Sequence, residues 1–216
     1  MIITELFQNP AYFLILALSV IYGITIHEFA HVYSAYLQGD NTGQANGRLT
    51  LNPIKHLDLF GTLAILFIGF GWGKPAPYNP YNLRYHKWGP ALVSIAGPIS
   101  NFASVLLFAV VLKLILVFSS LPLDNLLIVF LTILIYINLL LGIFNLIPIP
   151  PLDGSKILFT LIPIKNPNIM IFFERYGMFI VLLLLILGMG IFSMIIGYAF
   201  YYLVELFNMP EVFSVL

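Results

Sequence analysis

The sequence of 216 residues contains no cysteine and little charge, since Asp, Glu, Lys and Arg together make up 8% of it. The absence of cysteine excludes disulfide bonds and thiolate metal ligands. A soluble domain carries about 25% charged residues, so this chain, which is 61% hydrophobic, has too few polar residues to cover itself in water. It also lacks net charge and any basic run, which excludes nucleic acid as an expected partner. We therefore expect an integral membrane protein.

The N-terminal region lacks the features of a cleaved signal peptide. It has no basic segment, and the apolar stretch from Ala11 has no small-residue cleavage site. We therefore expect a retained first helix. No repeat and no long polar stretch divides the rest of the sequence, so we predict a single intramembrane domain over residues 1–216.

Four apolar segments are long enough to cross a bilayer as helices, which takes roughly 20 residues. They run from about Pro10 to Leu37, Pro90 to Phe118, Leu126 to Leu146 and Asn168 to Leu206, the last being long enough to be tilted, kinked or split. The shorter segment 59–73 is rich in glycine, β-branched and aromatic residues, which predicts a re-entrant loop or strand pair buried in protein. The predicted fold class is an all-α polytopic membrane protein. It has about four transmembrane helices plus a re-entrant loop or small β element around residues 45–87.

The positions of lysine and arginine predict an orientation. If the first helix starts outside the cytoplasm, residues 39–89 and 148–175 are cytoplasmic and hold eight of the nine Lys and Arg residues. The ninth, Lys113, can extend to the interface from the outer end of its helix. We expect a multi-pass protein of the cell membrane with both termini away from the cytoplasm. A full span at residues 59–73 would break this sorting.

The stretch "HEFAH" places His27, Glu28 and His31 inside the first apolar segment. On a helix the two histidines lie one turn apart on the same face, where their imidazoles can hold one metal ion, and Zn²⁺ suits nitrogen ligands. Glu28 is turned away from this pair and is placed to take a proton from metal-activated water. The alternative is that the three residues only join helices by hydrogen bonds. Their cost in a membrane favours the metal site.

A catalytic zinc usually has three protein ligands and one open position. We expect the third ligand to be Asp153, because the prolines of "NLIPIPPLDG" end the third helix and Gly154 permits a tight turn there. This places the carboxylate near the cytoplasmic end of that helix, at the depth of His31. Asp153 could instead cap the next helix. His56, Asp58 and His86 are rival ligands on loops beside the interface.

Four motifs in order, "HEFAH", "LTLNPIKHLDLFGTL", "AGPISN" and "NLIPIPPLDG", resemble the site-2 protease family of intramembrane zinc metalloproteases. The resemblance covers about residues 20–160. It implies that His27, His31 and Asp153 bind one zinc ion per chain and that Glu28 is the catalytic acid and base. It also implies cleavage of membrane-spanning substrates near the cytoplasmic side. The chain differs from many members in lacking a preceding helix, an inserted PDZ domain and a nucleotide-binding tail.

Two asparagines in later helices are further candidates for the catalytic site. Asn101 lies in "AGPISN", and Asn145 shares a helix face with Asn138 and Gly142. Such residues often serve only helix packing. The functional hypothesis is that Asn101 or Asn145 stabilises the oxyanion or the substrate backbone. The edge of segment 59–73 could pair with an extended substrate strand.

The expected partners are transmembrane protein substrates and the lipid bilayer. One alternative function is a metal-ion transporter, but its ligands would extend across the membrane, whereas here the ionisable residues cluster at one depth. A second is a catalytically silent protein that binds membrane helices, and the intact motifs count against it. A third is a zinc protease of the prenyl-protein-processing kind, whose downstream glutamate would have to be Glu174.

Overall fold

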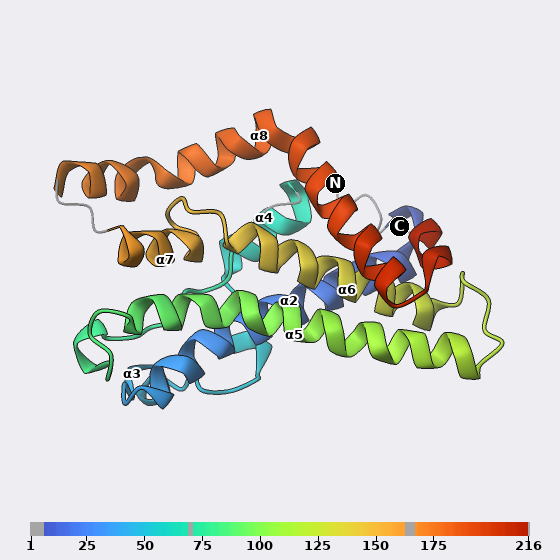
Figure 1. Cartoon of the computed structure of the whole chain (residues 1–216), viewed down its shortest axis with the longest axis horizontal. Helices are drawn as coiled ribbons and strands as arrows, with labels where there is room; N and C mark the ends of the chain where they lie inside the picture. Colours follow the sequence, from blue (N-terminus) through green and yellow to red (C-terminus); the bar gives the residue numbers. More distant parts are fainter. Residues whose placement is uncertain (1–6, 69–70, 163–166, 216) are drawn as a thin grey trace.

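The structure is a computed structural model that describes residues 7–68, 71–162 and 167–215 (Figure 1). In this part of the chain there is no strand, and four helices are long and apolar enough to cross a membrane. The predicted all-α class with about four spans is confirmed. These helices are α2 (Pro10–Leu37), α5 (Gly89–Phe118), α6 (Leu126–Asn145) and the Arg175–Leu206 part of α8 (Pro167–Leu206).

Helices α2, α5 and α6 pack against one another along their lengths and form what we call the three-helix unit (Figure 1). Small residues allow the close approach that membrane helices need. A side chain added at Gly23 of α2 would lie 2.6 Å from Leu141 of α6, and one added at Gly142 of α6 would lie 2.9 Å from the Phe102 ring of α5. The remaining space is filled by buried aliphatic residues such as Leu112, which is 0% exposed.

Local sequence sets where these helices begin and end. The Asn9 side chain accepts a hydrogen bond from the Tyr12 amide at the start of α2, and Asn125 caps α6 in the same way. Helix α6 ends at Asn145, just before the prolines that remove backbone donors. Helix α5 continues through Pro98.

The segment predicted to re-enter the membrane contains a helix. Residues Leu59–Ile68 form α4, and the chain then returns so that Leu57 and Gly73 pair in an isolated β-bridge. Residues 69–70, within the predicted segment, lie outside the described residues. Close backbone contact between Gly61 and Trp72 brings the two arms together. The chain therefore doubles back, and of the two expected alternatives, a re-entrant loop or a strand pair, the strand pair is wrong. A mostly apolar segment of ten residues satisfies its own backbone groups better as a helix.

Helix α8 lies along one edge of the molecule and changes direction near its middle (Figure 1). Near its start, Val181 packs with Phe144 and Leu152, and near its end Phe200 joins the core of the three-helix unit. Between these anchors the side chains are mostly exposed. The short elements are α3 (Thr42–Ala45), η1 (Pro53–Lys55), η2 (Pro80–Asn82), α7 (Asp153–Leu161) and η3 (Pro210–Val215).

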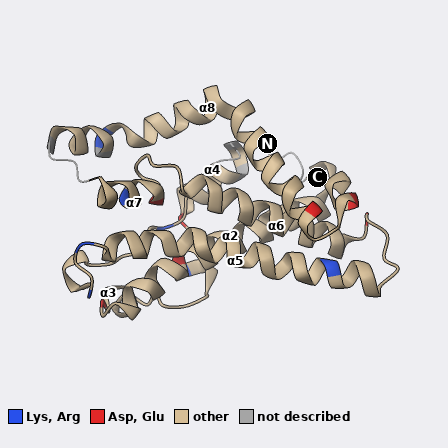
Figure 2. Ribbon diagram, in the orientation of Figure 1, with Lys and Arg blue, Asp and Glu red and all other residues tan. Residues whose placement is uncertain are grey.

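Opposite ends of the molecule carry different charges (Figure 2). The start of α2, the α5–α6 link and the chain end lie together, since Tyr12, Asp124 and Ser214 line one hollow of about 400 Å³. Lys113 lies at this end, where its ammonium donates a hydrogen bond to the carbonyl of Asn208, just beyond α8. The other basic residues gather mainly toward the opposite end (Figure 2).

Candidate metal centre

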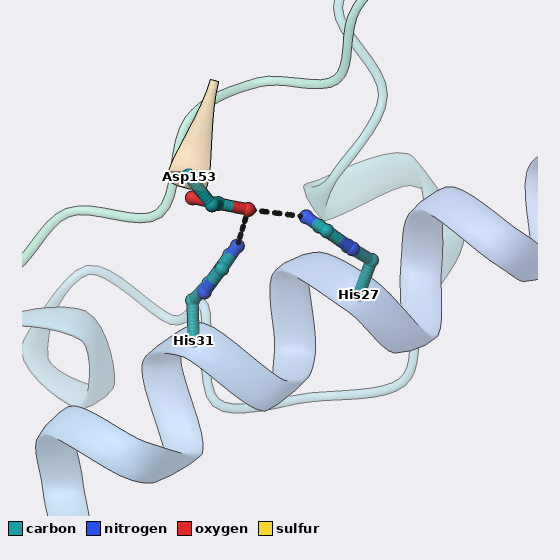
Figure 3. A group of neighbouring side chains, drawn as sticks. All are labelled: His27, His31 and Asp153. Atoms are coloured by element: carbon teal, nitrogen blue, oxygen red, sulfur yellow. Dashed lines mark hydrogen bonds and ion pairs between the residues drawn. The ribbon is translucent and has the colours of Figure 1, made fainter. Parts of the chain in front are cut away.

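His27, His31 and Asp153 meet inside the molecule (Figure 3). His27 Nε2 lies 3.0 Å and His31 Nε2 lies 3.1 Å from the same Asp153 oxygen, Oδ2. All three side chains are buried, and their ligand atoms lie within 4.8 Å of one another. The two histidines are one turn apart on α2, while Asp153 enters from the first residue of α7. The structure thus brings together the three residues that the sequence singled out as metal ligands.

The hydrogen bonds on the far side of each ring show that this group suits a cation. His27 Nδ1 lies 2.6 Å from Asn101 Oδ1, and His31 Nδ1 lies 2.7 Å from the carbonyl oxygen of Val93. Both oxygens can only accept, so both Nδ1 atoms carry the proton in a neutral imidazole. Each Nε2 then presents a lone pair to the Asp153 carboxylate. Two lone pairs facing an anionic oxygen require a positive charge between them, which a Zn²⁺ ion would provide.

Asp153 is held in place by the turn that precedes α7. Gly154 packs directly on the backbone carbonyl of Leu146, where any side chain would collide. Burial alone would raise the pKa of the Asp153 carboxyl, but when protons on His31 and His27 take the place of the cation between them, the two rings outweigh burial and hold that pKa well below its usual range. The carboxyl is therefore ionised. Its position in the first turn of α7 also favours a negative charge, because the helix dipole is positive there.

Gly97 of α5 makes room for both imidazoles. A Cβ atom at this position would lie 2.5 Å from His31 Cε1 and 2.6 Å from His27 Cε1. Real Cβ atoms do not approach other atoms so closely, so only glycine fits beside the two rings. The rings themselves meet edge to face, with centroids 4.6 Å apart.

Glu28 lies beside this group with a buried, unpartnered carboxylate oxygen. Its Oε2 atom is shielded from solvent and has no hydrogen-bond partner. The side chain packs next to Gly73, where an added Cβ would lie 3.4 Å from Glu28 Cγ. A buried acceptor without a partner is costly, and such groups are more often found where a reactant binds.

The loop around Glu28 contributes two buried polar side chains, of which the sequence singled out only His56, as a rival metal ligand. Arg48 is 5% exposed and donates a hydrogen bond to the Lys74 carbonyl at 2.6 Å. His56 Nε2–H donates to the Thr50 carbonyl at 2.6 Å, and the ring is 0% exposed. Burial and the nearby Arg48 charge lower the pKa of His56. The lowered pKa favours the neutral ring, which holds the loop through its hydrogen bond to the Thr50 carbonyl.

The rival third ligands lie elsewhere. Among the described residues, His56, Asp58 and His86 are not in the group that could hold a metal ion. Asp58 instead accepts a hydrogen bond from the Gly61 amide at the start of α4. Glu174 lies on α8, and its side chain is outside the described part of the structure.

The two candidate asparagines differ in what they contact. Asn101 is 0% exposed, and its amide nitrogen donates to the Gly23 carbonyl and to Asn138 Oδ1. With both N–H groups used, this geometry favours positioning of His27 over donation to an oxyanion. Asn145 is half-buried and donates one N–H to the Leu141 carbonyl at 3.0 Å. Its second N–H remains available.

Three features of the site went beyond the sequence predictions. The Val93 carbonyl is a backbone group, so no side-chain pattern identifies it. The sequence predicts only a helix-packing role for Asn138, whereas in the structure it is fully buried and bonded to Asn101. Gly97 stands four residues before Asn101 on the same helix face, and that spacing was the one available indication of its contact with the site.

Comparison with known proteins gives one family. Residues 13–188 match the sequence profile of "Peptidase family M50". The chain is 43% identical over 183 residues to the "Putative zinc metalloprotease YwhC" of Bacillus subtilis, with 81% of each chain covered. It is 31% identical over 169 residues to the "Putative zinc metalloprotease Rip2" of Mycolicibacterium smegmatis, covering 76% of this chain and 63% of that protein. No solved structure matches.

Proposed function

The chain belongs to peptidase family M50, the site-2 protease family, and on that premise we propose that it is an intramembrane zinc endopeptidase that cleaves membrane-spanning substrates. The family, the metalloprotease class and the use of zinc, which the motifs predicted, are confirmed by these matches. The residue roles, the substrate class and the orientation in the membrane are proposals, supported as follows.

His27, His31 and Asp153 are the proposed zinc ligands. The observation that carries this assignment is the convergence of two Nε2 lone pairs and one ionised carboxylate within 4.8 Å, inside the molecule. Zinc bound there supplies a Lewis acid, which polarises a peptide carbonyl and lowers the pKa of a water molecule to about 7.

Glu28 is the proposed acid and base. Its buried Oε2 has no partner in the protein, so it is free to accept a proton as the water attacks the peptide carbon. Glu28 then delivers that proton to the leaving amine, and the carboxylate is restored. General acid–base transfer of this kind contributes about 10² to 10⁴ in rate.

Asn145 is the proposed donor to the developing oxyanion, because it retains an N–H without a protein partner at the end of α6. Asn101 is better assigned to orienting His27. Gly154, next to Asp153, packs on the carbonyl of Leu146, next to Asn145, and this supports a place for Asn145 near the site.

Transmembrane proteins are the proposed substrates, and the proposed site faces the cytoplasmic half of the cell membrane. The sorting of basic residues toward one end supports this orientation (Figure 2). Accessibility labelling of single cysteines, introduced into the cysteine-free chain at Ser214 and at Lys87, tests it. We expect Ser214 to be labelled from outside the cell and Lys87 only from the cytoplasm, and the reverse result would contradict the orientation.

The decisive experiment compares Glu28→Gln with His27→Ala in the purified protein, with zinc content and cleavage of a panel of single-span membrane proteins as readouts. Glu28→Gln preserves the size of the side chain but cannot take the proton, so it should keep zinc and lose nearly all cleavage. His27→Ala should lose both. A Glu28→Gln protein that cleaves at near wild-type rate would exclude the proposed role.

The third ligand is tested separately by zinc content. Asp153→Ala should lose most of the metal, whereas His56→Ala and Asp58→Ala should keep it. The assignment of Asp153 is wrong if the protein keeps full zinc without Asp153 but loses it without His56 or Asp58.

A further inference from the structure

We propose that Asn138 of α6, which is bonded to neither histidine, sets the zinc affinity by fixing the orientation of the Asn101 amide. This inference rests on the proposed role of His27 as a zinc ligand. It assigns to the third helix of the three-helix unit a part in tuning the metal site.

Three hydrogen bonds run in series across the three helices, and a fourth branches from Asn101. His27 Nδ1 donates to Asn101 Oδ1 at 2.6 Å, and Asn101 Nδ2 donates to Asn138 Oδ1 at 3.0 Å. Asn138 Nδ2 in turn donates to the Leu134 carbonyl at 2.8 Å, and Asn101 Nδ2 also donates to the Gly23 carbonyl at 3.1 Å. Both asparagines are 0% exposed, so the protein itself must satisfy their polar groups.

The direction of this series is determined by the backbone at its far end. The Leu134 carbonyl can only accept, so Asn138 must present its nitrogen there and its oxygen to Asn101. Asn101 must therefore present its nitrogen to Asn138 and its oxygen to His27. That oxygen requires a proton on His27 Nδ1, which leaves the Nε2 lone pair for the metal.

A flipped Asn101 amide would reverse this outcome. Its nitrogen would face His27 Nδ1, which would then have to accept, and the ring proton would move to Nε2, where zinc must bind. With Asn138 present, the flip also sets two oxygens against each other in a buried site. Without the Asn138 oxygen, only the Gly23 carbonyl opposes the flip, so more molecules would adopt the state that cannot bind zinc.

His31 provides an internal contrast. Its Nδ1 donates to the backbone carbonyl of Val93 on α5, which has no amide to flip. The tautomer of neutral His31 is therefore fixed without help, whereas that of His27 depends on a side chain that needs its own restraint. Partners of this kind typically change metal affinity by about 10- to 100-fold when they are removed.

The test measures zinc affinity of the purified full-length protein by competition with a chelator. We expect Asn101→Leu to weaken binding by about 10- to 100-fold and Asn138→Leu by about 3- to 10-fold. Asn138→Asp, with a proton on the oxygen that faces the Leu134 carbonyl, keeps an acceptor facing Asn101 and should bind zinc nearly as well as the wild type. The matched control is Ser104→Ala, which removes a partly buried hydrogen bond between Tyr22 and Ser104 of the same α2–α5 pair and should leave zinc affinity unchanged.

Wild-type affinity in Asn138→Leu would overturn the inference, as would an equal loss in Ser104→Ala. Nitrogen NMR of the metal-free wild type gives a test that needs no variant to fold. When His27 is neutral, its proton should be on Nδ1. A proton on Nε2 would also overturn the inference. If His27→Ala keeps its zinc, the proposed function fails instead, because His27 is then not a ligand.

Discussion

Helix α8 is more apolar than α2 of the three-helix unit, yet fewer of its residues are buried. The most apolar window of α8 has a mean hydropathy of 3.0, but only 11% of its residues are buried. The corresponding window of α2, which carries the two histidines, has a mean hydropathy of 1.8 and is 33% buried. Apolarity alone does not decide burial, because α6 has a mean hydropathy of 2.8 and is 50% buried. What distinguishes the packed helices is small and polar residues at their contacts.

The largest expected effect compares glycines in the two regions. Gly97→Ala should abolish zinc binding, because its Cβ would lie 2.5 to 2.6 Å from atoms of both imidazoles. Gly190→Ala on α8 should change neither zinc content nor folding, since an added Cβ there meets nothing within 4 Å. Zinc analysis of the two purified variants checks this. Equal zinc content in both variants would mean that α5 shifts to accommodate the added methyl group. The expected difference between α5 and α8 would then be wrong.

A second comparison lies within α8. Phe200 is fully buried in the core of the three-helix unit and contacts the Tyr136 ring edge to face. Phe200→Ala should lower the free energy of unfolding by about 3 to 5 kcal/mol. Leu187→Ala, at a position 76% exposed in the middle of α8, should change it by less than about 0.5 kcal/mol. Denaturation of both variants in the same detergent measures the difference, and similar losses would show that the middle of α8 is packed.

The first anchor of α8 should have an intermediate effect. Gly177 packs directly on the Pro150 carbonyl, in the turn that leads to Asp153. Gly177→Ala should push α8 away from this turn and weaken zinc binding by about 10-fold, which corresponds to about 1.4 kcal/mol. Gly188→Ala is the control, because nothing lies within 4 Å of its added Cβ. Unchanged zinc affinity in Gly177→Ala would show that the packing of α8 on this turn does not affect zinc binding.

The smallest expected effect lies outside the spans and depends on pH. Asp40 accepts hydrogen bonds from Thr42, Asn79 and Asn82 and so joins the end of α2 to the loop before α5. Burial would raise the pKa of Asp40, but these hydrogen bonds outweigh it and lower that pKa. Its stabilising contribution is therefore complete above the unfolded value of about 3.9 and is lost as the pH falls through the lower folded value.

Asp40→Ala measures that contribution directly. At pH 7 it should lower the free energy of unfolding by about 1 to 2 kcal/mol. The difference from the wild type should shrink as the pH falls below about 4, because the carboxylate of the unfolded wild type then takes up a proton at a higher pH than that of the folded protein. Thermal denaturation of both proteins from pH 7 to pH 3 gives the comparison. A difference that stays constant with pH would show that the charge of Asp40 does not contribute.

The same contrast explains how far the sequence could predict the fold. Spans follow from composition alone, so the expected segments Pro90–Phe118 and Leu126–Leu146 agree within one residue with α5 and α6. The secondary structure of the segment after Asp58 was harder to predict, because β-branched and aromatic residues suit a strand and a membrane helix equally. Whether this segment is helical depends on which of its backbone hydrogen-bonding groups the surrounding protein can satisfy. A local sequence pattern does not contain that information.

The metal site likewise has features that the sequence could predict and features that it could not. The spacing of His27 and His31 follows from helix geometry, so their shared face could be predicted. The meeting with Asp153 was expected from a common depth, and the structure brings the three together. The direction of the Asn101 amide could not be predicted, because it depends on Asn138 and on carbonyl groups of two other helices.

The separation of the site residues along the chain has a consequence for biosynthesis. Asp153 lies 126 residues after His27. At about 5 to 20 residues per second, the ribosome reaches it about 6 to 25 s after the first histidine. During that interval the growing chain contains "HEFAH" but lacks the carboxylate that completes the group. A chain that stops before the α7 turn therefore contains both histidines and no complete site, so the order of synthesis itself delays assembly until three spans have been made.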